Sequence, residues 1–81
     1  MRFHGDVSKA GRLFLSDVTG ELDRDERGGW FVVPQGGNYP PAGDYELRLS
    51  DGRSAAILLG SVTSGSHRQT VAHFRVNGSW Q

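Results

Sequence analysis

Residues 44–59 read DYELRLSDGRSAAILL, and this stretch decides the fold class. In its first half the apolar Tyr45, Leu47 and Leu49 alternate with polar residues, which is the pattern of a half-buried β-strand. Asp51-Gly52 follows, and Asp-Gly between two strand-like segments is the strongest short-range signal for a hairpin. We therefore predict an antiparallel hairpin whose first strand turns these three apolar side chains toward a core.

The second half of the stretch does not alternate, since Ala55–Leu59 is apolar on both faces. It predicts a central strand covered on both sides, a strand that closes a barrel, or a strand with one face against a second subunit. The register of the hairpin is open, because turns of two and of three residues differ by one position. That position decides whether Ile57 or Leu58 faces the core.

Twelve glycines spread along the chain make long helices improbable and divide it into short segments. Further strands are predicted at residues 3–7, 12–18, 30–33 and 70–76. Thr19–Leu22 is expected to reverse the chain, and the five charged residues 23–27 are expected to form an exposed connection. Residues 66–77 also fit helical spacing, but their β-branched residues favour a strand.

The 81 residues predict one domain, spanning 1–81. We predict an all-β fold of about six mostly antiparallel strands, a meander that closes toward a small barrel, with a small β-sandwich as the alternative. Closure removes the exposed strand edges that so short a chain would otherwise carry. Trp30 and Trp80 are expected to cap the barrel ends. The predicted core positions are Leu13, Leu15, Val32, Tyr45, Leu47, Leu49, Ile57, Phe74 and Val76.

Composition narrows the chemistry further. The chain has no cysteine, which excludes disulfides and thiolate metal sites and fits a reducing compartment. No stretch approaches the ~20 apolar residues of a membrane span, and the first residues lack the apolar run of a signal peptide. The formal net charge is zero, which argues against non-specific nucleic-acid binding. We therefore expect a cytoplasmic protein without a membrane partner.

Pro34–Asp44 separates two predicted strands and holds all three prolines of the chain. Its length is that of a compact Ω-loop, longer than a usual connection. Pro34 ends a strand because it cannot donate to a sheet ladder. Tyr39 has two interpretations: it packs over an open barrel end, or the loop presents it to a ligand.

Motifs for catalysis are absent from the sequence. It holds three histidines but no metal-ligand pattern, phosphate-binding glycine loop or nucleophile elbow, so we expect no cofactor, no metal and no enzyme activity. The leading hypothesis is a non-catalytic module that binds a protein or small ligand, or self-associates through Ala55–Leu59. A barrel that binds single-stranded nucleic acid is the alternative, and a small enzyme comes third. The candidate binding residues are Trp30, Tyr39, Arg48, Arg53, His73 and Arg75.

Overall fold

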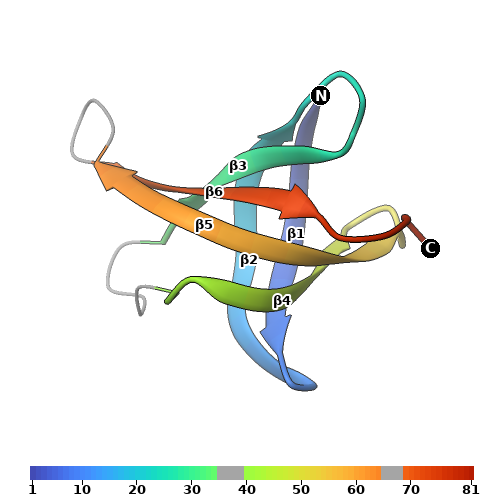
Figure 1. Ribbon diagram of the computed structural model, residues 1–81, viewed down its shortest axis with the longest axis horizontal. Helices are drawn as coiled ribbons and strands as arrows, with labels where there is room; N and C mark the ends of the chain where they lie inside the picture. The colour runs from blue at the N-terminus through green and yellow to red at the C-terminus, as the bar shows by residue number, and fades with distance from the viewer. Residues whose placement is uncertain (35–39, 65–68) are drawn as a thin grey trace.

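The computed structural model describes residues 1–34, 40–64 and 69–81 (Figure 1). Within these residues the chain forms strands and turns and contains no helix. The strands are β1 (Arg2–Lys9), β2 (Arg12–Leu22), β3 (Gly28–Val33), β4 (Gly43–Leu49), β5 (Ser54–Ser64) and β6 (Thr70–Val76). The strand interpretation of residues 70–76 is therefore confirmed over the helical one.

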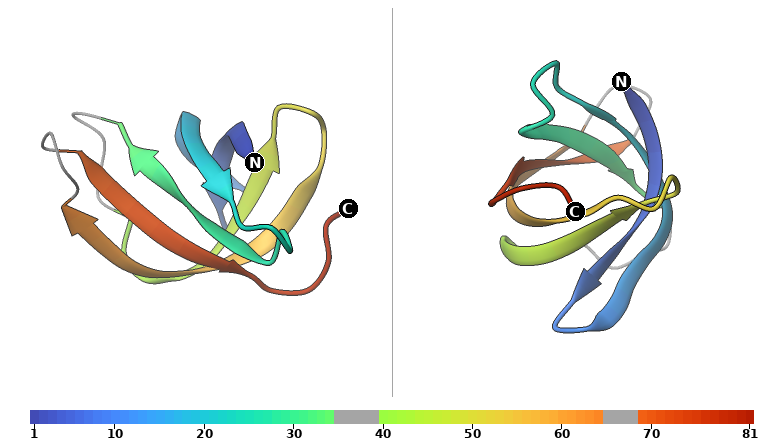
Figure 2. Two further views of the ribbon diagram at one scale, coloured as in Figure 1. Left: turned by 90° about the horizontal axis from the view of Figure 1, so that it is seen from above. Right: turned by 90° about the vertical axis from the view of Figure 1, so that its right-hand side faces the viewer.

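The strands of the described residues close into an antiparallel barrel with the order β1-β2-β3-β6-β5-β4. Because β4 returns to pair with β1 and not with β3, the first four strands form a Greek key. Figures 1 and 2 show β6, β5 and β4 side by side on one face, with β1 and β2 running across behind them. The predicted small six-strand barrel is confirmed, and its meander is interrupted where the chain crosses from β3 to β4.

The hairpin of β4 and β5 has the longer of the two turns considered. The Leu49 backbone N–H donates to the Arg53 carbonyl over 2.7 Å, and Gly52 N–H donates to the Leu49 carbonyl over 3.0 Å. Gly52 has a φ of 99°, a conformation that glycine adopts without strain. Since this register pairs Tyr45 with Ile57, Ile57 faces the core and Leu58 faces outward.

The barrel interior is filled by apolar side chains from all of these strands. The buried core consists of Phe3, Val7, Leu15, Val18, Leu22, Phe31, Val33, Tyr45, Leu47, Leu49, Ile57, Leu59, Ala72 and Phe74. The predicted core positions that it confirms are Leu15, Tyr45, Leu47, Leu49, Ile57 and Phe74. Val76 is half-buried and packs against this core.

The prediction of Leu13 as a core residue is wrong, because a bulge in β2 changes the alternation. Val7 of β1 pairs with Leu15, but the next residue, Ser8, pairs with Leu13. Phe14 is therefore the extra residue of a β-bulge, and residues on either side of a bulge no longer share a face by counting. The Leu13 side chain consequently points outward and is 62% exposed.

Two expectations for β3 are also wrong. Phe31 and Val33 are buried, whereas Trp30 and Val32 are half-exposed on the outer wall. Because all four residues from Trp30 to Val33 are apolar, the sequence does not show which alternate pair faces the core. The pairing with β6 turns Phe31 and Val33 inward. Val32 is thus no core residue, and Trp30 caps neither end of the barrel.

The expected chain reversal at Thr19–Leu22 does not occur there. β2 runs straight through Gly20 to Leu22, and the reversal falls in residues 23–27. Gly20 serves close packing instead of a turn, because a Cβ at this position would overlap the Trp30 carbonyl oxygen of the neighbouring strand.

Tyr45 holds the start of β4 in place at one end of the barrel. Its hydroxyl donates to the Pro41 carbonyl over 2.7 Å, which anchors the end of the crossing from β3. The Phe14 ring meets the Tyr45 ring edge-on at 5.8 Å, and Lys9 Nζ lies 4.4 Å from the Tyr45 ring centre. Burial raises the pKa of the Tyr45 phenol above its ordinary value of 10.0.

Replacing Tyr45 with Phe is expected to lower the free energy of unfolding by about 1 kcal/mol near pH 7, through loss of one hydrogen bond. The raised pKa adds a dependence on pH. The stability that the buried phenol contributes is fully present below the pKa of about 10 that it has in the unfolded chain. This stability is lost as the pH rises through the higher pKa of the folded state. Urea unfolding at pH 7 and pH 11 should therefore show the difference between wild type and Tyr45→Phe shrinking at high pH. An unchanged difference would contradict a buried, neutral phenol.

Candidate functional site

The outer wall of β3 and β6 carries the half-buried aromatic side chain of Trp30. Trp30 faces outward because its neighbour Phe31 faces the core, and successive side chains of a strand alternate. Across the ladder it pairs with His73 on β6 and with Glu21 on β2. The next pair on the same face of β3 and β6, two residues along, is Gly28 with Arg75. Three of the predicted binding residues, Trp30, His73 and Arg75, are thus brought together.

A hollow of about 680 Å³ lies beside Trp30 on this wall. It is lined by Asp23, Asp25, Arg27, Gly28, Gly29, Trp30, His73, Phe74, Arg75 and Val76. Gly28 and Gly29 help to keep its floor low, because neither places a side chain there. Two aspartates and two arginines surround it, so their formal charges cancel. The hollow therefore suits a ligand without a strong net charge.

Trp30 also lines a second hollow of about 430 Å³, toward the opposite side of β3. This hollow lies where β2 and β3 separate, since their pairing covers only residues 20–22 and 29–31. It is lined by Arg2, Asp17, Thr19, Gly20, Trp30, Val32, Pro34 and Gln69. The indole consequently borders two depressions, one on each side of β3.

His73 is held in place on this surface by a neighbour on β5. Its Nε2 lies 3.3 Å from Thr63 Oγ1, within hydrogen-bond distance. The imidazole is exposed, and within the described part of the chain no hydrogen bond engages its Nδ1. His73 can therefore offer one hydrogen-bonding nitrogen to a ligand that covers Trp30.

Arg53 is engaged in the fold and lies away from Trp30. Its guanidinium contacts Glu26 at 2.9 Å and Asp51 at 3.0 Å, and it lies 5.6 Å from the Trp80 ring centre. The Arg53 backbone N–H, together with its guanidinium, holds the pKa of Asp51 below its usual value. The structure therefore gives Arg53 a stabilising role at the end of the barrel where the C-terminal residues pack.

The other predicted residues do not join the Trp30 surface. Arg48 lies on β4, which β5 and β6 separate from β3 in the barrel order. Arg48 and Arg75 pair with different residues of β5, Ser54 and Leu58, and Asp44 and Glu46 share the outer face of β4 with Arg48. The two arginines thus do not form the single basic face that the nucleic-acid hypothesis requires. Tyr39 lies outside the described residues, and both of its interpretations stay predictions.

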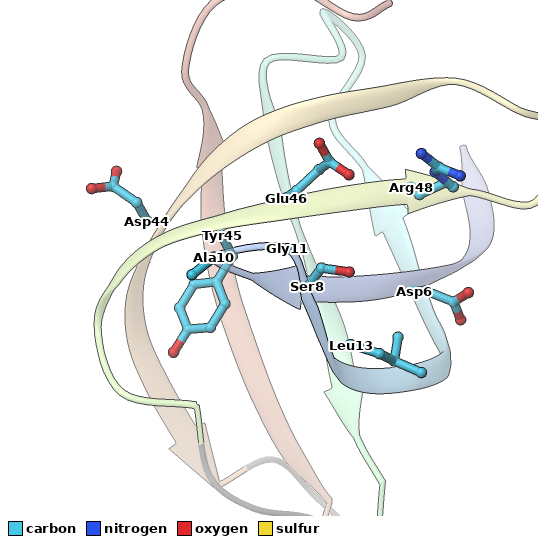
Figure 3. Close-up of a pocket in the computed structure, with 9 residues that line it drawn as sticks. All are labelled: Asp6, Ser8, Ala10, Gly11, Leu13, Asp44, Tyr45, Glu46 and Arg48. Atoms are coloured by element: carbon cyan, nitrogen blue, oxygen red, sulfur yellow. The ribbon is translucent and has the colours of Figure 1, made fainter.

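A hollow of about 610 Å³ between β4 and the β1–β2 hairpin was not anticipated from the sequence (Figure 3). It is lined by Asp6, Ser8, Ala10, Gly11, Leu13, Asp44, Tyr45, Glu46 and Arg48. The exposed Leu13 belongs to it only because of the bulge at Phe14, which no periodicity in the sequence reveals. Acidic side chains outnumber Arg48 here, so the electrostatic character of this hollow differs from that beside Trp30.

His4 lies beside a hydroxyl and a carboxylate of β2. His4 Nδ1 lies 3.3 Å from Thr19 Oγ1 and 4.0 Å from Asp17 Oδ1, but the His4 and Asp17 side chains are largely exposed to water. In the described part of the chain, no three His, Asp or Glu side chains are grouped to hold a metal ion. Nor does that part contain a helix of the length and apolarity needed to span a membrane.

Comparison of the chain with protein-family models, with curated proteins and with solved structures found no match. The functional argument therefore depends on the side chains and their arrangement.

Proposed function

We propose that the protein is a non-catalytic binding module, which holds an extended segment of another protein on the outer wall of β3 and β6. One observation carries this proposal: the half-buried Trp30 borders two hollows, with His73 and Arg75 beside it. Tryptophan and arginine are the residue types that dominate binding energy in protein interfaces. A peptide side chain in each hollow would place the intervening backbone over the indole.

The charges around Trp30 favour a protein segment over nucleic acid. Proteins that bind nucleic acid neutralise several phosphates with Lys and Arg. Here Asp23 and Asp25 line the same hollow as Arg27 and Arg75, so a phosphate would meet attraction and repulsion together. A single-stranded oligonucleotide could still stack on Trp30, but the electrostatic term that dominates such binding is missing. The absence of catalysis and a cytoplasmic location stay predictions from the sequence.

Replacing Trp30 with Ala is expected to weaken peptide binding at least about 30-fold, the effect of losing a hot-spot anchor of roughly 2 kcal/mol. The ligands would be peptides selected from a random displayed library against the wild-type protein. Binding would be followed by NMR, where the Trp30 indole N–H should shift and that of Trp80 should not. The free energy of unfolding should change by less than about 1 kcal/mol, because Trp30 lies on the outer wall and does not pack against the core cluster.

Leu13→Ala provides the matched control, because Leu13 is an exposed apolar residue outside both Trp30 hollows. It should leave peptide affinity within about twofold of wild type. Peptides that bind Trp30→Ala as well as wild type would contradict the proposal. Tight binding of a poly-dT oligonucleotide at low salt, lost in Trp30→Ala, would favour the nucleic-acid alternative instead.

A further inference from the structure

The outer face of β4, β5 and β6 carries an apolar residue between opposite charges. Leu58 of β5 is 48% exposed, and it pairs with Asp44 on one side and with Arg75 on the other. Among the described residues, no ion pair or hydrogen bond engages the side chains of Asp44 and Arg75. Asp44, Leu58 and Arg75 therefore lie side by side across the three strands, as an acidic, an apolar and a basic residue.

The next row reinforces this pattern. Ala56 of β5 is exposed and pairs with Glu46 of β4. On its other side it neighbours Asn77, whose backbone N–H donates to the Ala56 carbonyl over 2.8 Å. The apolar Leu58 and Ala56 thus follow each other on the middle strand, and both carboxylates lie on β4, where Arg48 comes next, opposite Ser54. Figure 1 shows these three strands side by side across the front of the molecule, with no other strand covering them.

We propose that this face binds a second copy of the chain in a symmetric homodimer. Most homodimers have two-fold symmetry, in which the same patch on each copy must be complementary to itself. When two sheet faces meet, a two-fold axis can run along the strands or across them. An axis along β5 places β4 of one copy over β6 of its partner, so that Asp44 faces Arg75 of the other copy and Leu58 meets Leu58. An axis across the strands would place Asp44 against Asp44 and Arg75 against Arg75. The charge pattern therefore selects the axis along β5.

The dimer should be weak. The patch is three strands wide, roughly 14 Å at the usual strand spacing of about 4.8 Å, and Figure 2 shows that the strands curve away from it. Such a contact belongs to the class of small, transient interfaces. We therefore expect a dissociation constant of the dimer on the order of 0.1 mM. This constant should rise as salt is added, because salt screens exposed ion pairs.

Charge reversal provides the test. Sedimentation equilibrium of the full chain from about 10 µM to 1 mM should show a monomer–dimer equilibrium at low salt. Asp44→Arg and Arg75→Asp should each weaken the dimer at least tenfold, because symmetry applies each change twice. The double variant, carrying both changes, should return within about threefold of wild type. Leu58→Ala should weaken it as well, and circular dichroism should confirm that all variants fold.

Trp30→Ala is the matched control, since Trp30 lies on β3 outside the patch and its loss should leave the dimer unchanged. This control separates the dimer from the proposed peptide site, even though Arg75 borders both. A wild-type protein that stays monomeric through 1 mM would overturn the proposal. So would single reversals that leave the dimer intact, or a double variant that is not rescued.

Discussion

Replacing Gly20 with Ala is expected to lower the free energy of unfolding by about 3 kcal/mol or more, a large share of what a small domain has. Gly20 lies in the interior of β2, opposite Phe31. An added Cβ would overlap the Trp30 carbonyl oxygen and lie 2.7 Å from Phe31 Cα and 2.9 Å from the Phe3 ring. Because two of these atoms belong to the backbone, relief requires β3 to move away from β2, and side-chain rotation is insufficient.

Gly60→Ala is the matched control for this prediction. Gly60 is also a strand glycine, but the nearest atom to an added Cβ is the His73 carbonyl oxygen at 3.9 Å, an ordinary contact. Urea unfolding should place Gly60→Ala within about 1 kcal/mol of wild type. Equal stabilities for the Gly20 and Gly60 variants would contradict the close approach of β2 and β3.

The β4–β5 hairpin could be predicted from the sequence, whereas the role of Gly20 could not. Alternation and the Asp51-Gly52 turn predicted the β4–β5 hairpin, because those signals are local and the hairpin is too. A glycine, by contrast, signals either a turn or a close approach of two backbones, and the sequence does not distinguish them. The predicted reversal at Thr19–Leu22 includes Gly20, but Gly20 lies within β2, where the paired backbone of β3 approaches closely.

Core assignments failed for a related reason. Counting along a strand assumes an unbroken ladder, and the bulge at Phe14 breaks it, so that Leu13 leaves the face of Leu15. In β3 the run from Trp30 to Val33 is apolar throughout, and only the neighbouring strands decide its frame. Both errors, at Leu13 and at Val32, arise because the pairing with a neighbouring strand decides which side chains face the core.

The candidate site was predictable in its residue types but not in its assembly. Trp30 and His73 are neighbours only because β3 pairs with β6, and strands that distant in sequence leave no local signal of pairing. Arg53 is one of the predicted binding residues, yet its guanidinium forms ion pairs with Glu26 and Asp51. The sequence alone does not distinguish an arginine that forms ion pairs within the fold from one that is free to bind a ligand, because its neighbours in space are not known.

The two tryptophans should therefore respond differently to the same substitution. Trp80 packs against the core from the C-terminal segment, its Nε1–H donates to the Glu26 carbonyl over 2.8 Å, and the Arg53 guanidinium lies over its ring. Trp80→Ala is expected to cost about 2–3 kcal/mol of unfolding free energy, somewhat less than a fully buried Trp→Ala because the ring is partly exposed. Trp30→Ala, on the outer wall, should cost less than about 1 kcal/mol.

The same substitution should release the end of the chain. Ser54 and Gln81 exchange two backbone hydrogen bonds, of 3.1 and 2.8 Å, and Trp80 lies next to them. Without the indole these amides should lose protection from hydrogen exchange, while those of the β3–β6 ladder keep it. Trp80→Phe retains most of the apolar contact and loses only the indole hydrogen bond, so it should cost about 1 kcal/mol. If Trp80→Ala were no less stable than Trp30→Ala, the C-terminal segment would not be closing the barrel end, because a surface indole and a packed one would then contribute alike.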